Sequence, residues 1–316
     1  MTNTTSISRK KSSFVAFLLL LSMLVTTAIS FRPDIPFEQV RQKYATAASK
    51  FMNIDGMQIH YQDEGTGPIL IMIHGSNCSL QSWNGWQQYL KRQFRVISFD
   101  LPGHGLTGPN PKGEYDYAAM TRILDQLANN LHIGKFSLAG NSMGGAIALH
   151  YTMQHPGKVE KLVLIDSLGY PGEIPPVTLR MWGWPVVGRM LTVLTPRFVY
   201  AQTLKEIYGH KERVSEQLID RYYELLLREG NREATRRRFI APAWDIEPAR
   251  LKTIETPTLV MWGEKDPWFN ADFGRQFARD IPNASFRLYP GLGHLAMEED
   301  PETTARDVAM FLASRQ

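Results

Sequence analysis

The chain has 316 residues, of which 43% are hydrophobic and 21% are charged, and its formal net charge is +4. These values are those of an ordinary globular protein, and the length suffices for one large α/β domain with a smaller insertion. A charge this small gives no reason to expect a nucleic-acid partner. The single cysteine, Cys78, excludes a disulfide within the chain, and we expect it to be a buried bystander.

The N-terminal segment, residues 1–30, is expected to lie outside the folded domain. Basic residues 9–11 precede an apolar run at residues 14–29, and a polar linker that begins at Arg32 follows. This order is typical of a signal peptide or signal anchor, whose basic end stays in the cytoplasm. We therefore expect the rest of the chain to be exported. We favour an uncleaved, single-helix membrane anchor over a cleaved signal that would leave a periplasmic or secreted protein.

The first half of the remaining chain alternates between strands and helices. Residues 57–61 alternate as a strand, and Gly65-Thr66-Gly67 predicts a hairpin turn. Further apolar strands are expected at residues 69–73, at residues 94–100, just before Ser142 and at residues 161–166, with a helix at residues 117–131. This alternation predicts a mostly parallel sheet flanked by helices.

Residues 136–149 predict a short apolar strand, a tight turn with Ser142 at its tip, and then a helix from about Met143. The turn carries the sequence Gly140-Asn-Ser142-Met-Gly144, which is the Gly-x-Ser-x-Gly nucleophile elbow. Glycine at the two flanking positions removes Cβ atoms that would crowd the turn. The N-terminus of the helix directs its dipole at the serine oxygen. We therefore predict that Ser142 is a catalytic nucleophile.

A serine nucleophile needs a histidine to accept its proton and a carboxylate to orient that histidine. An apolar strand that begins at Thr258 runs into a loop with two carboxylates, Glu264 and Asp266, and a later strand ends in a glycine-rich turn that carries His294. Both loops follow strand ends, where open α/β sheets place their sites. We predict His294 as the general base. We predict Asp266 rather than Glu264 as the acid, because Asp266 lies deeper in the loop and has the shorter side chain.

Two backbone N–H groups are expected to stabilise the oxyanion that forms on the substrate. One belongs to Met143, the residue after the nucleophile. The other is expected in the loop after the strand at residues 69–73, where His74, Gly75 and Ser76 follow. Because Gly75 lets the backbone approach closely, we predict Ser76 as the second donor and His74 as a structural residue of the loop.

From residue 171 to residue 250 the pattern changes to helices rich in large apolar residues, including an amphipathic helix at residues 214–228. We interpret this region as a helical cap that covers Ser142 and makes a concave, apolar binding site. Residues 31–170 and 251–316 then form the two parts of the α/β core. The basic cluster Arg236-Arg237-Arg238 is interpreted as one charged helix face.

Several motifs together resemble the α/β-hydrolase superfamily: His74-Gly75, Asp100-Leu-Pro-Gly-His-Gly105, Gly140-Asn-Ser-Met-Gly144, Asp266 and Gly293-His294. The similarity runs from about Phe51 to the C-terminus. It implies the α/β-hydrolase fold, with an eight-stranded, mostly parallel sheet, flanking helices and an inserted cap. A serine nucleophile argues against the haloalkane dehalogenases and most epoxide hydrolases of the superfamily, which use aspartate. The elbow is similar to that of carbon–carbon hydrolases of meta-cleavage products, but those enzymes usually carry Trp after the catalytic His, where this chain has Leu295.

These features predict a serine hydrolase that cleaves a small, mainly apolar carboxylic ester or related acyl compound through an acyl-enzyme. Hydrolysis of a carbon–carbon bond is the alternative. A ligand-binding protein without catalysis is a third hypothesis, against which the intact set of Ser142, Asp266 and His294 weighs. The sequence has no glycine-rich phosphate loop and no metal-ligand spacing, so we expect no cofactor and no metal.

Overall fold

The computed structural model describes residues 30–241 and 246–314. Eight strands form one sheet in the order β1-β2-β4-β3-β5-β6-β7-β8. The two strands at one edge pair antiparallel, with β1 against β2 and β2 against β4, and all other neighbours pair parallel. The strands are β1 (Lys50–Ile54), β2 (Met57–Glu64), β3 (Ile69–Ile73), β4 (Arg95–Phe99), β5 (Phe136–Asn141), β6 (Val159–Ile165), β7 (Thr258–Gly263) and β8 (Ala284–Tyr289).

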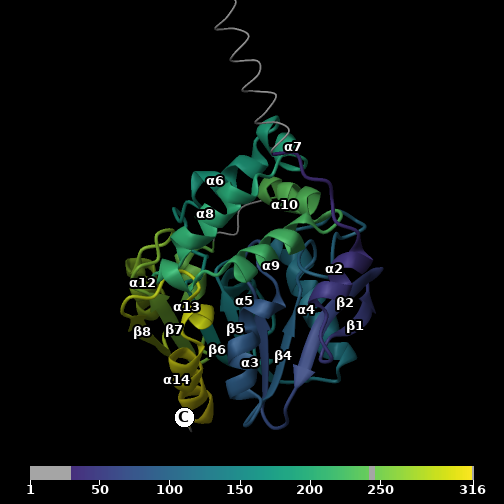
Figure 1. Cartoon of the computed structure of the whole chain (residues 1–316). Helices are drawn as coiled ribbons and strands as arrows, with labels where there is room; N and C mark the ends of the chain where they lie inside the picture. Colours follow the sequence, from purple (N-terminus) through teal and green to yellow (C-terminus); the bar gives the residue numbers. More distant parts are fainter. Residues whose placement is uncertain (1–29, 242–245, 315–316) are drawn as a thin grey trace, which may run out of the picture.

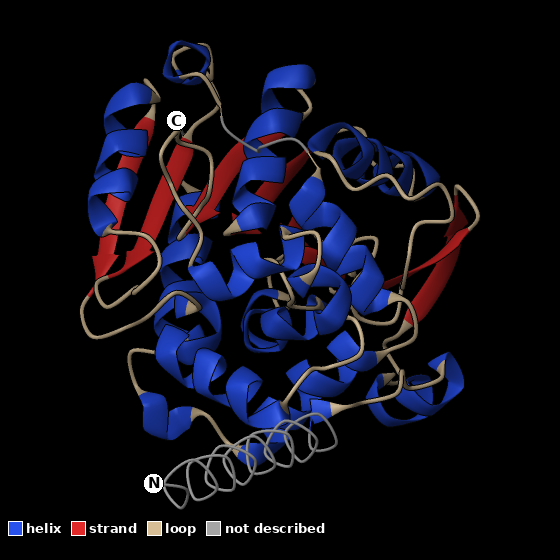
Figure 2. Cartoon of the chain, turned by 90° about the horizontal axis from the view of Figure 1, so that it is seen from above, coloured by secondary structure: helices blue, strands red, loops and turns tan. Residues whose placement is uncertain are grey.

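Helices cover both faces of this sheet (Figures 1 and 2). The alternation of side chains along β3 divides the interior in two. Ile71 and Ile73 pack with α4, α5 and α12, whereas Leu70 and Met72 pack with α3 and α14 on the other face. Because both faces are covered, the central strands are continuous apolar runs. The core helices are α2 (Phe37–Tyr44), α3 (Asn84–Leu90), α4 (Tyr117–Asn130), α5 (Met143–Gln154), α12 (Ala271–Asp280), α13 (Ala296–Glu299) and α14 (Pro301–Ala313).

The described residues between β6 and β7 form helices that lie over the carboxyl ends of the parallel strands (Figure 1). Ser215 caps the longest of them, α9, by accepting a hydrogen bond from the amide of Leu218, and Tyr222 and Leu225 form part of its buried face. The helices of this region are α6 (Val177–Arg180), α7 (Val187–Leu191), α8 (Arg197–Ile207), α9 (Glu216–Leu227), α10 (Asn231–Ile240) and α11 (Pro248–Leu251).

The hairpin predicted at residues 65–67 is wrong, because β4 lies between β2 and β3 in the sheet. The two glycines serve a close approach instead. A Cβ atom on Gly65 would lie 2.3 Å from the carbonyl oxygen of Phe94, and one on Gly67 would lie 2.7 Å from that of Gln93. Both residues also have positive φ angles, of 82° and 110°. The connection at residues 65–67 thus packs against the residues that lead into β4. Its glycines indicated a turn, but not that β2 would pair with β4.

Within the described residues, no helix combines the length and apolar character that a membrane span requires. The predicted anchor at residues 14–29 lies outside the described residues. The described part of the chain begins with Ser30 beside the cap. The amide of Thr195 donates to the carbonyl of Ser30, and the amide of Arg32 donates to that of Val193.

Candidate active site

Ser142 lies at the turn between β5 and α5, with φ 54° and ψ −120°. A residue with a side chain adopts this region at a cost of about 1–3 kcal/mol, so the surrounding structure must hold it there. The amide of Ser142 donates to the carbonyl of Ile165 at 3.0 Å, and the amide of Leu168 donates to the carbonyl of Ser142 at 3.1 Å. A Cβ atom on Gly140 would lie 2.2 Å from the carbonyl oxygen of Gly144. The glycines of the motif are therefore a steric requirement of the turn.

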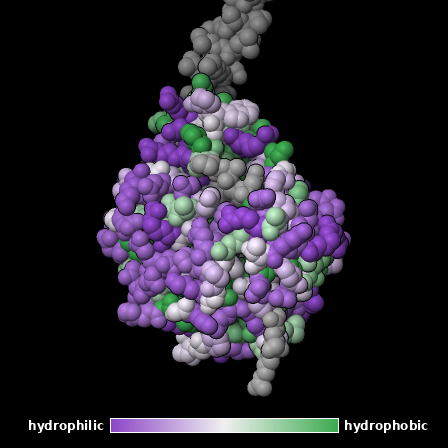
Figure 3. All heavy atoms as spheres, turned by 180° about the vertical axis from the view of Figure 1, so that it is seen from behind, coloured by the Kyte–Doolittle hydropathy of each residue, from purple (hydrophilic) through white to green (hydrophobic). Residues whose placement is uncertain are grey.

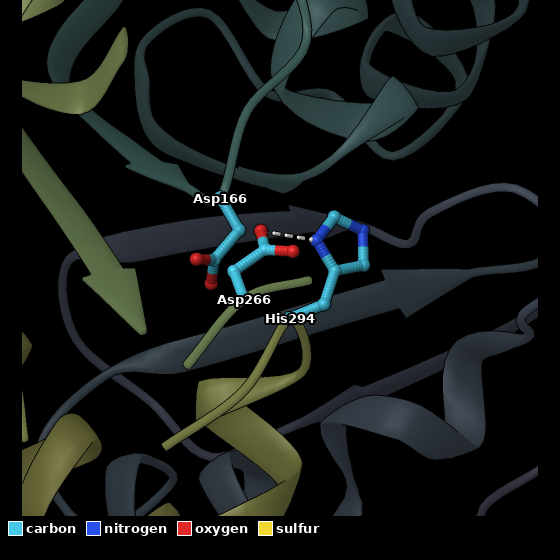
Figure 4. A group of neighbouring side chains, drawn as sticks. All are labelled: Asp166, Asp266 and His294. Atoms are coloured by element: carbon cyan, nitrogen blue, oxygen red, sulfur yellow. Dashed lines mark hydrogen bonds and ion pairs between the residues drawn. The ribbon is translucent and has the colours of Figure 1, made fainter. Parts of the chain in front are cut away.

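His294 and Asp266 meet through a hydrogen bond of 2.7 Å between Nδ1 of the imidazole and Oδ2 of the carboxylate (Figure 4). Their side chains are 2% and 1% exposed. The other oxygen of Asp266 accepts hydrogen bonds from the amides of Trp268 at 2.8 Å and Phe269 at 3.1 Å. These bonds fix the carboxylate, so it can hold the imidazole with Nδ1 protonated and Nε2 available as a base.

The backbone also positions the imidazole. The amide of His294 donates to the carbonyl of Ile207 in the cap, and its carbonyl accepts from the side chain of Asn141, next to the nucleophile. The ring of Trp268 lies 4.9 Å from the imidazole, centroid to centroid. Nε2 of His294 is buried and has no hydrogen-bond partner among the described residues. His294 and Ser142 line the same cavity, which is where a proton would have to pass between them.

Glu264, the carboxylate that we did not choose, lies away from this pair. It is exposed, and it accepts a hydrogen bond from the amide of Gly291 at 3.0 Å. Of the two carboxylates after β7, the structure brings only Asp266 to His294.

Ser76 and Met143 both line a cavity that reaches Ser142. The loop after β3 lies directly against the nucleophile, since a Cβ atom on Gly75 would lie 3.2 Å from Cβ of Ser142. A Cβ atom on Gly144 would lie 2.2 Å from the carbonyl of Ile73 at the end of β3. The two glycines therefore allow the β3 loop and the start of α5 to meet at Ser142, where both predicted donors are needed.

The two other residues of this loop that the sequence singled out are buried. His74 donates from Nδ1 to the carbonyl of Gly75 at 2.8 Å and accepts at Nε2 from the amide of Leu101 at 3.0 Å. Burial lowers the pKa of His74, which keeps the ring neutral in this structural role. Burial raises the pKa of Cys78 to about 12, so its thiol is not a nucleophile at neutral pH.

Asp166 is a third acidic residue at this place, and the sequence analysis did not identify it (Figure 4). It follows β6 directly and is fully buried, with φ 43°. One of its oxygens accepts from the amide of Gly263 at 2.8 Å, and the other has no partner among the described residues. Burial and then the neighbouring Asp266 carboxylate raise the pKa of Asp166 well above its ordinary value. The sequence does contain a signal for Asp166, which is a carboxylate at the end of an apolar strand. The same signal predicted Asp266.

Asp166, Asp266 and His294 each offer a ligand atom within 4.8 Å of the others, which is the geometric minimum for a metal ion. The hydrogen bond between His294 and Asp266 already occupies one nitrogen and one oxygen of that set. A metal ion bound at Nδ1 of His294 or Oδ2 of Asp266 would have to replace this hydrogen bond. The group therefore fits proton chemistry better than metal binding.

Two cavities meet at Ser142. The first, of about 930 Å³ counting its open mouth, reaches His294 and is lined by apolar cap residues such as Leu179, Trp182 and Leu204. The second, of about 1140 Å³ counting its mouth, runs past Ser76 and Met143 to Arg238. A substrate bound at Ser142 can therefore place the two sides of its cleavable bond in two cavities with different linings.

The prediction that Arg236, Arg237 and Arg238 form one charged face is wrong for Arg238. Arg236 and Arg237 pair with Glu233, but Arg238 is 3% exposed and turns inward. It donates to Oγ of Ser76 at 3.0 Å, to Oδ1 of Asn77 at 2.8 Å and to Nε2 of His104 at 2.9 Å. None of these partners is a carboxylate, and burial lowers the pKa of Arg238 to about 10. The side chain is thus a buried cation that forms no ion pair with a described residue, beside the predicted oxyanion loop.

Comparisons with known proteins agree with this fold. The chain matches the alpha/beta hydrolase fold family over residues 68–301, and it belongs to that family. It is 27% identical over 271 residues to an uncharacterized hydrolase, YugF, of Bacillus subtilis strain 168, a match that covers 85% of this chain and 99% of the relative. It is 29% identical over 291 residues to 2-hydroxy-6-oxo-6-(2'-aminophenyl)hexa-2,4-dienoic acid hydrolase of Metapseudomonas resinovorans, covering 88% of this chain and 96% of the relative. Among solved structures, a thermophilic esterase from Thermogutta terrifontis is similar with a TM-score of 0.71 and 25% identity, covering 84% of this chain and 96% of the esterase.

The expected fold class is therefore confirmed, and the protein is a hydrolase of this superfamily. The roles of the individual site residues stay predictions.

Asp166 gives a prediction about stability. Its pKa is higher in the folded chain than in the unfolded chain, where an Asp ionises near about 3.9. The native state therefore binds this proton more tightly, and stability falls as the pH rises above about 4. Asp166→Asn removes the ionisation and leaves an amide that can donate to Asp266. We expect its unfolding midpoint at pH 7 to be roughly 3 °C or more above that of the parent.

Thermal unfolding followed by circular dichroism between pH 4 and pH 8 measures this difference, which should shrink toward pH 4. Asp272→Asn, at a side chain that is 81% exposed, is the matched control and should show no such pH-dependent gain. A midpoint for Asp166→Asn at or below that of the parent at pH 7 would contradict the prediction. Asp266, Glu299 and His294 are the ionisable groups that face Asp166, and all three are unchanged in both variants.

Proposed function

We propose that the protein is a serine hydrolase that cleaves a small, mainly apolar carboxylic ester through an acyl-enzyme. The observation that carries the proposal is the shared cavity of Ser142 and His294, with His294 held by Asp266 at 2.7 Å. A hydroxyl on a strained turn, a base and a fixed carboxylate are the three parts that acyl transfer requires.

In the proposed reaction, Oγ of Ser142 attacks the carbonyl carbon of the ester as Nε2 of His294 takes the serine proton. Asp266 stabilises the imidazolium that forms, through the hydrogen bond to Nδ1. The amides of Ser76 and Met143 donate to the oxyanion. His294 then gives its proton to the leaving alkoxide, the carbon–oxygen bond breaks, and a water molecule activated by the same histidine releases the acid.

The apolar lining of the first cavity supports a substrate with an apolar group. The side chains of Leu179 and Leu204 have no hydrogen-bonding group, and the side chain of Trp182 has only its indole N–H. The similarity to an esterase, at 25% identity, supports ester cleavage as the reaction type.

Arg238 favours a second candidate function, hydrolysis of a carbon–carbon bond in a dienoic keto acid. Such a substrate carries a carboxylate, and Arg238 is a buried cation that pairs with no carboxylate among the described residues, in a cavity that reaches Ser142. The relative named as a dienoic acid hydrolase supports the same reaction. Against it stands Leu295, which is 1% exposed and occupies the position where those enzymes usually have Trp. We prefer the ester, because Arg238 already has three polar partners that order the loop of Ser76.

The first test separates the predicted residues. Ser142→Ala should lower kcat for an aryl ester by a factor on the order of 10⁶, because the nucleophile is lost. Asp266→Asn should lower it by a factor on the order of 10⁴, because the imidazole loses its charged partner. Glu264→Gln is the matched control and should keep the parent rate. Activity of Ser142→Ala above a tenth of the parent rate, in protein with unchanged circular dichroism, would show that another residue is the nucleophile.

The second test separates the two reactions. The parent should hydrolyse neutral aryl esters faster than a dienoic meta-cleavage product. If Arg238 orders the loop of Ser76, Arg238→Gln should lower kcat/KM for both substrates by similar factors. A loss confined to the dienoic acid would instead assign Arg238 to the substrate carboxylate and favour carbon–carbon cleavage. Arg237→Gln, at an exposed neighbour, is the control for the change of charge.

We also propose that the protein is exported and held at a membrane by residues 14–29 as an uncleaved anchor. The basic residues 9–11 before the apolar run support this orientation. The intact chain should stay with the membrane fraction after a carbonate wash. A mature N-terminus near residue 31 in a soluble fraction would instead establish a cleaved signal.

A further inference from the structure

The exposed apolar side chains of this protein are concentrated on the cap. The described part of the chain has twelve exposed large apolar side chains, and nine of them lie within residues 174–240. A tenth, Phe31, lies beside this region through a backbone bridge to Leu194. The other two, Tyr89 and Met310, lie on α3 and α14 of the core. We define the cap face as the surface formed by Phe31, Trp184, Val186, Met190, Val193 and Phe198, around α7. These side chains are 45–69% exposed.

Figure 1 places α7 at the upper end of the molecule, farthest from α14. Apolar side chains appear among polar ones around this end when the molecule is seen from behind (Figure 3). Single exposed apolar residues are ordinary, but a gathering of this kind marks a surface that contacts an apolar partner.

One continuous interval of the cap has charged side chains of a single sign. No Asp or Glu occurs between Glu173 and Glu206, and the basic residues of this interval are Arg180, Arg189, Arg197 and Lys205. Arg197 pairs with Asp220 and Glu216. Arg180 and Arg189 are exposed and make no ion pair with a described residue. Apolar side chains that include Trp and Phe, mixed with unpaired arginines, are the composition of segments that lie at the surface of an anionic bilayer.

The N-terminal end of the described chain also lies at the cap face. Ser30 and Arg32 run beside Val193 and Thr195 through backbone hydrogen bonds of 2.9 and 3.0 Å. The apolar run at residues 14–29 therefore joins the described structure at the cap face. A membrane that held this run would lie next to the cap face.

We propose that the cap face lies on the surface of a lipid bilayer that contains anionic lipids. The apolar side chains enter the interface between head groups and acyl chains, and Arg180 and Arg189 bind lipid phosphates. The opposite side of the same segment, at Leu179, Trp182 and Leu191, lines the cavity of Ser142. Given the proposed ester hydrolysis, an apolar ester could then pass from the bilayer to the nucleophile without crossing bulk water.

A second copy of this chain is the competing occupant of the cap face. An isologous contact would bring Arg180 and Arg189 of two copies together, and no acidic residue of the interval 174–205 would neutralise them. The charge pattern therefore favours lipid phosphate over a second copy.

The test uses the full chain in vesicles of phosphatidylethanolamine and phosphatidylglycerol, and it does not depend on hydrolysis. Single cysteines replace Val186 and Phe198 on the cap face, and Tyr89 and Met310 on the core serve as matched controls, since they are exposed apolar residues too. The parent, whose Cys78 is buried, controls for background labelling. Each cysteine carries an environment-sensitive fluorophore, and the vesicles contain lipids with nitroxide-labelled acyl chains.

Acyl-chain nitroxides should quench the fluorophore at positions 186 and 198 several-fold more than at positions 89 and 310. The double change Arg180→Glu and Arg189→Glu should reduce that quenching without lowering the unfolding temperature or the hydrolysis of a water-soluble ester. Equal quenching at all four positions would overturn the proposal. Without vesicles, the fluorophores at positions 186 and 198 could also report an apolar environment that grows with protein concentration. That result would overturn the proposal and assign the cap face to a second copy. Loss of ester hydrolysis with quenching intact would count against the proposed function and not against the docking.

Discussion

Ser142 has a side chain in a backbone region that favours glycine, and the rest of the site depends on how the fold holds it there. The turn lies between β5 and α5 at the centre of the sheet. Its amide donates to the end of β6, and its carbonyl accepts from the residue that begins the connection to the cap. A hydrogen bond to a neighbour on each side holds this conformation against its backbone strain. The neighbouring elements thus position the nucleophile by holding the backbone of Ser142.

The same edge of the sheet collects the ionisable groups. Asp166 follows β6, Asp266 follows β7 and His294 follows β8, so three neighbouring parallel strands deliver their loops to one place. Two buried carboxylates so close together cannot both be charged at low cost, and burial together with the Asp266 carboxylate raises the pKa of Asp166 well above its ordinary value. Asp266 is the carboxylate that faces the imidazole, because two loop amides hold one of its oxygens and the other accepts from His294. Both side chains are buried, and their different hydrogen-bond partners separate their roles.

The sequence was sufficient for seven of the eight strands, for the elbow and for the choice of Asp266 as the partner of His294, because each depends on local signals: apolar runs, glycines at a fixed spacing and polar residues at strand ends. The edge strand β1 was not predicted from the sequence. It was insufficient where the outcome depends on residues distant in the chain. The glycines at 65 and 67 indicated a turn but not that β4 would be inserted between β2 and β3. Arg238 lies in a run of three arginines whose side chains look alike in sequence, and only the packing of α10 over the β3 loop distinguishes it. Asp166 follows an apolar strand as Asp266 does, and only the packing of neighbouring strand ends brings it to Asp266 and His294.

Covalent labelling with a fluorophosphonate measures whether Ser142 is an activated nucleophile. This reagent phosphonylates a serine, with loss of fluoride, only where a base has made the hydroxyl reactive. We expect one adduct per folded chain, located at Ser142 by peptide mass spectrometry, and slow or no labelling when His294 is replaced by Gln. Folded parent protein that stays unmodified, or an adduct at another residue, would contradict this expectation.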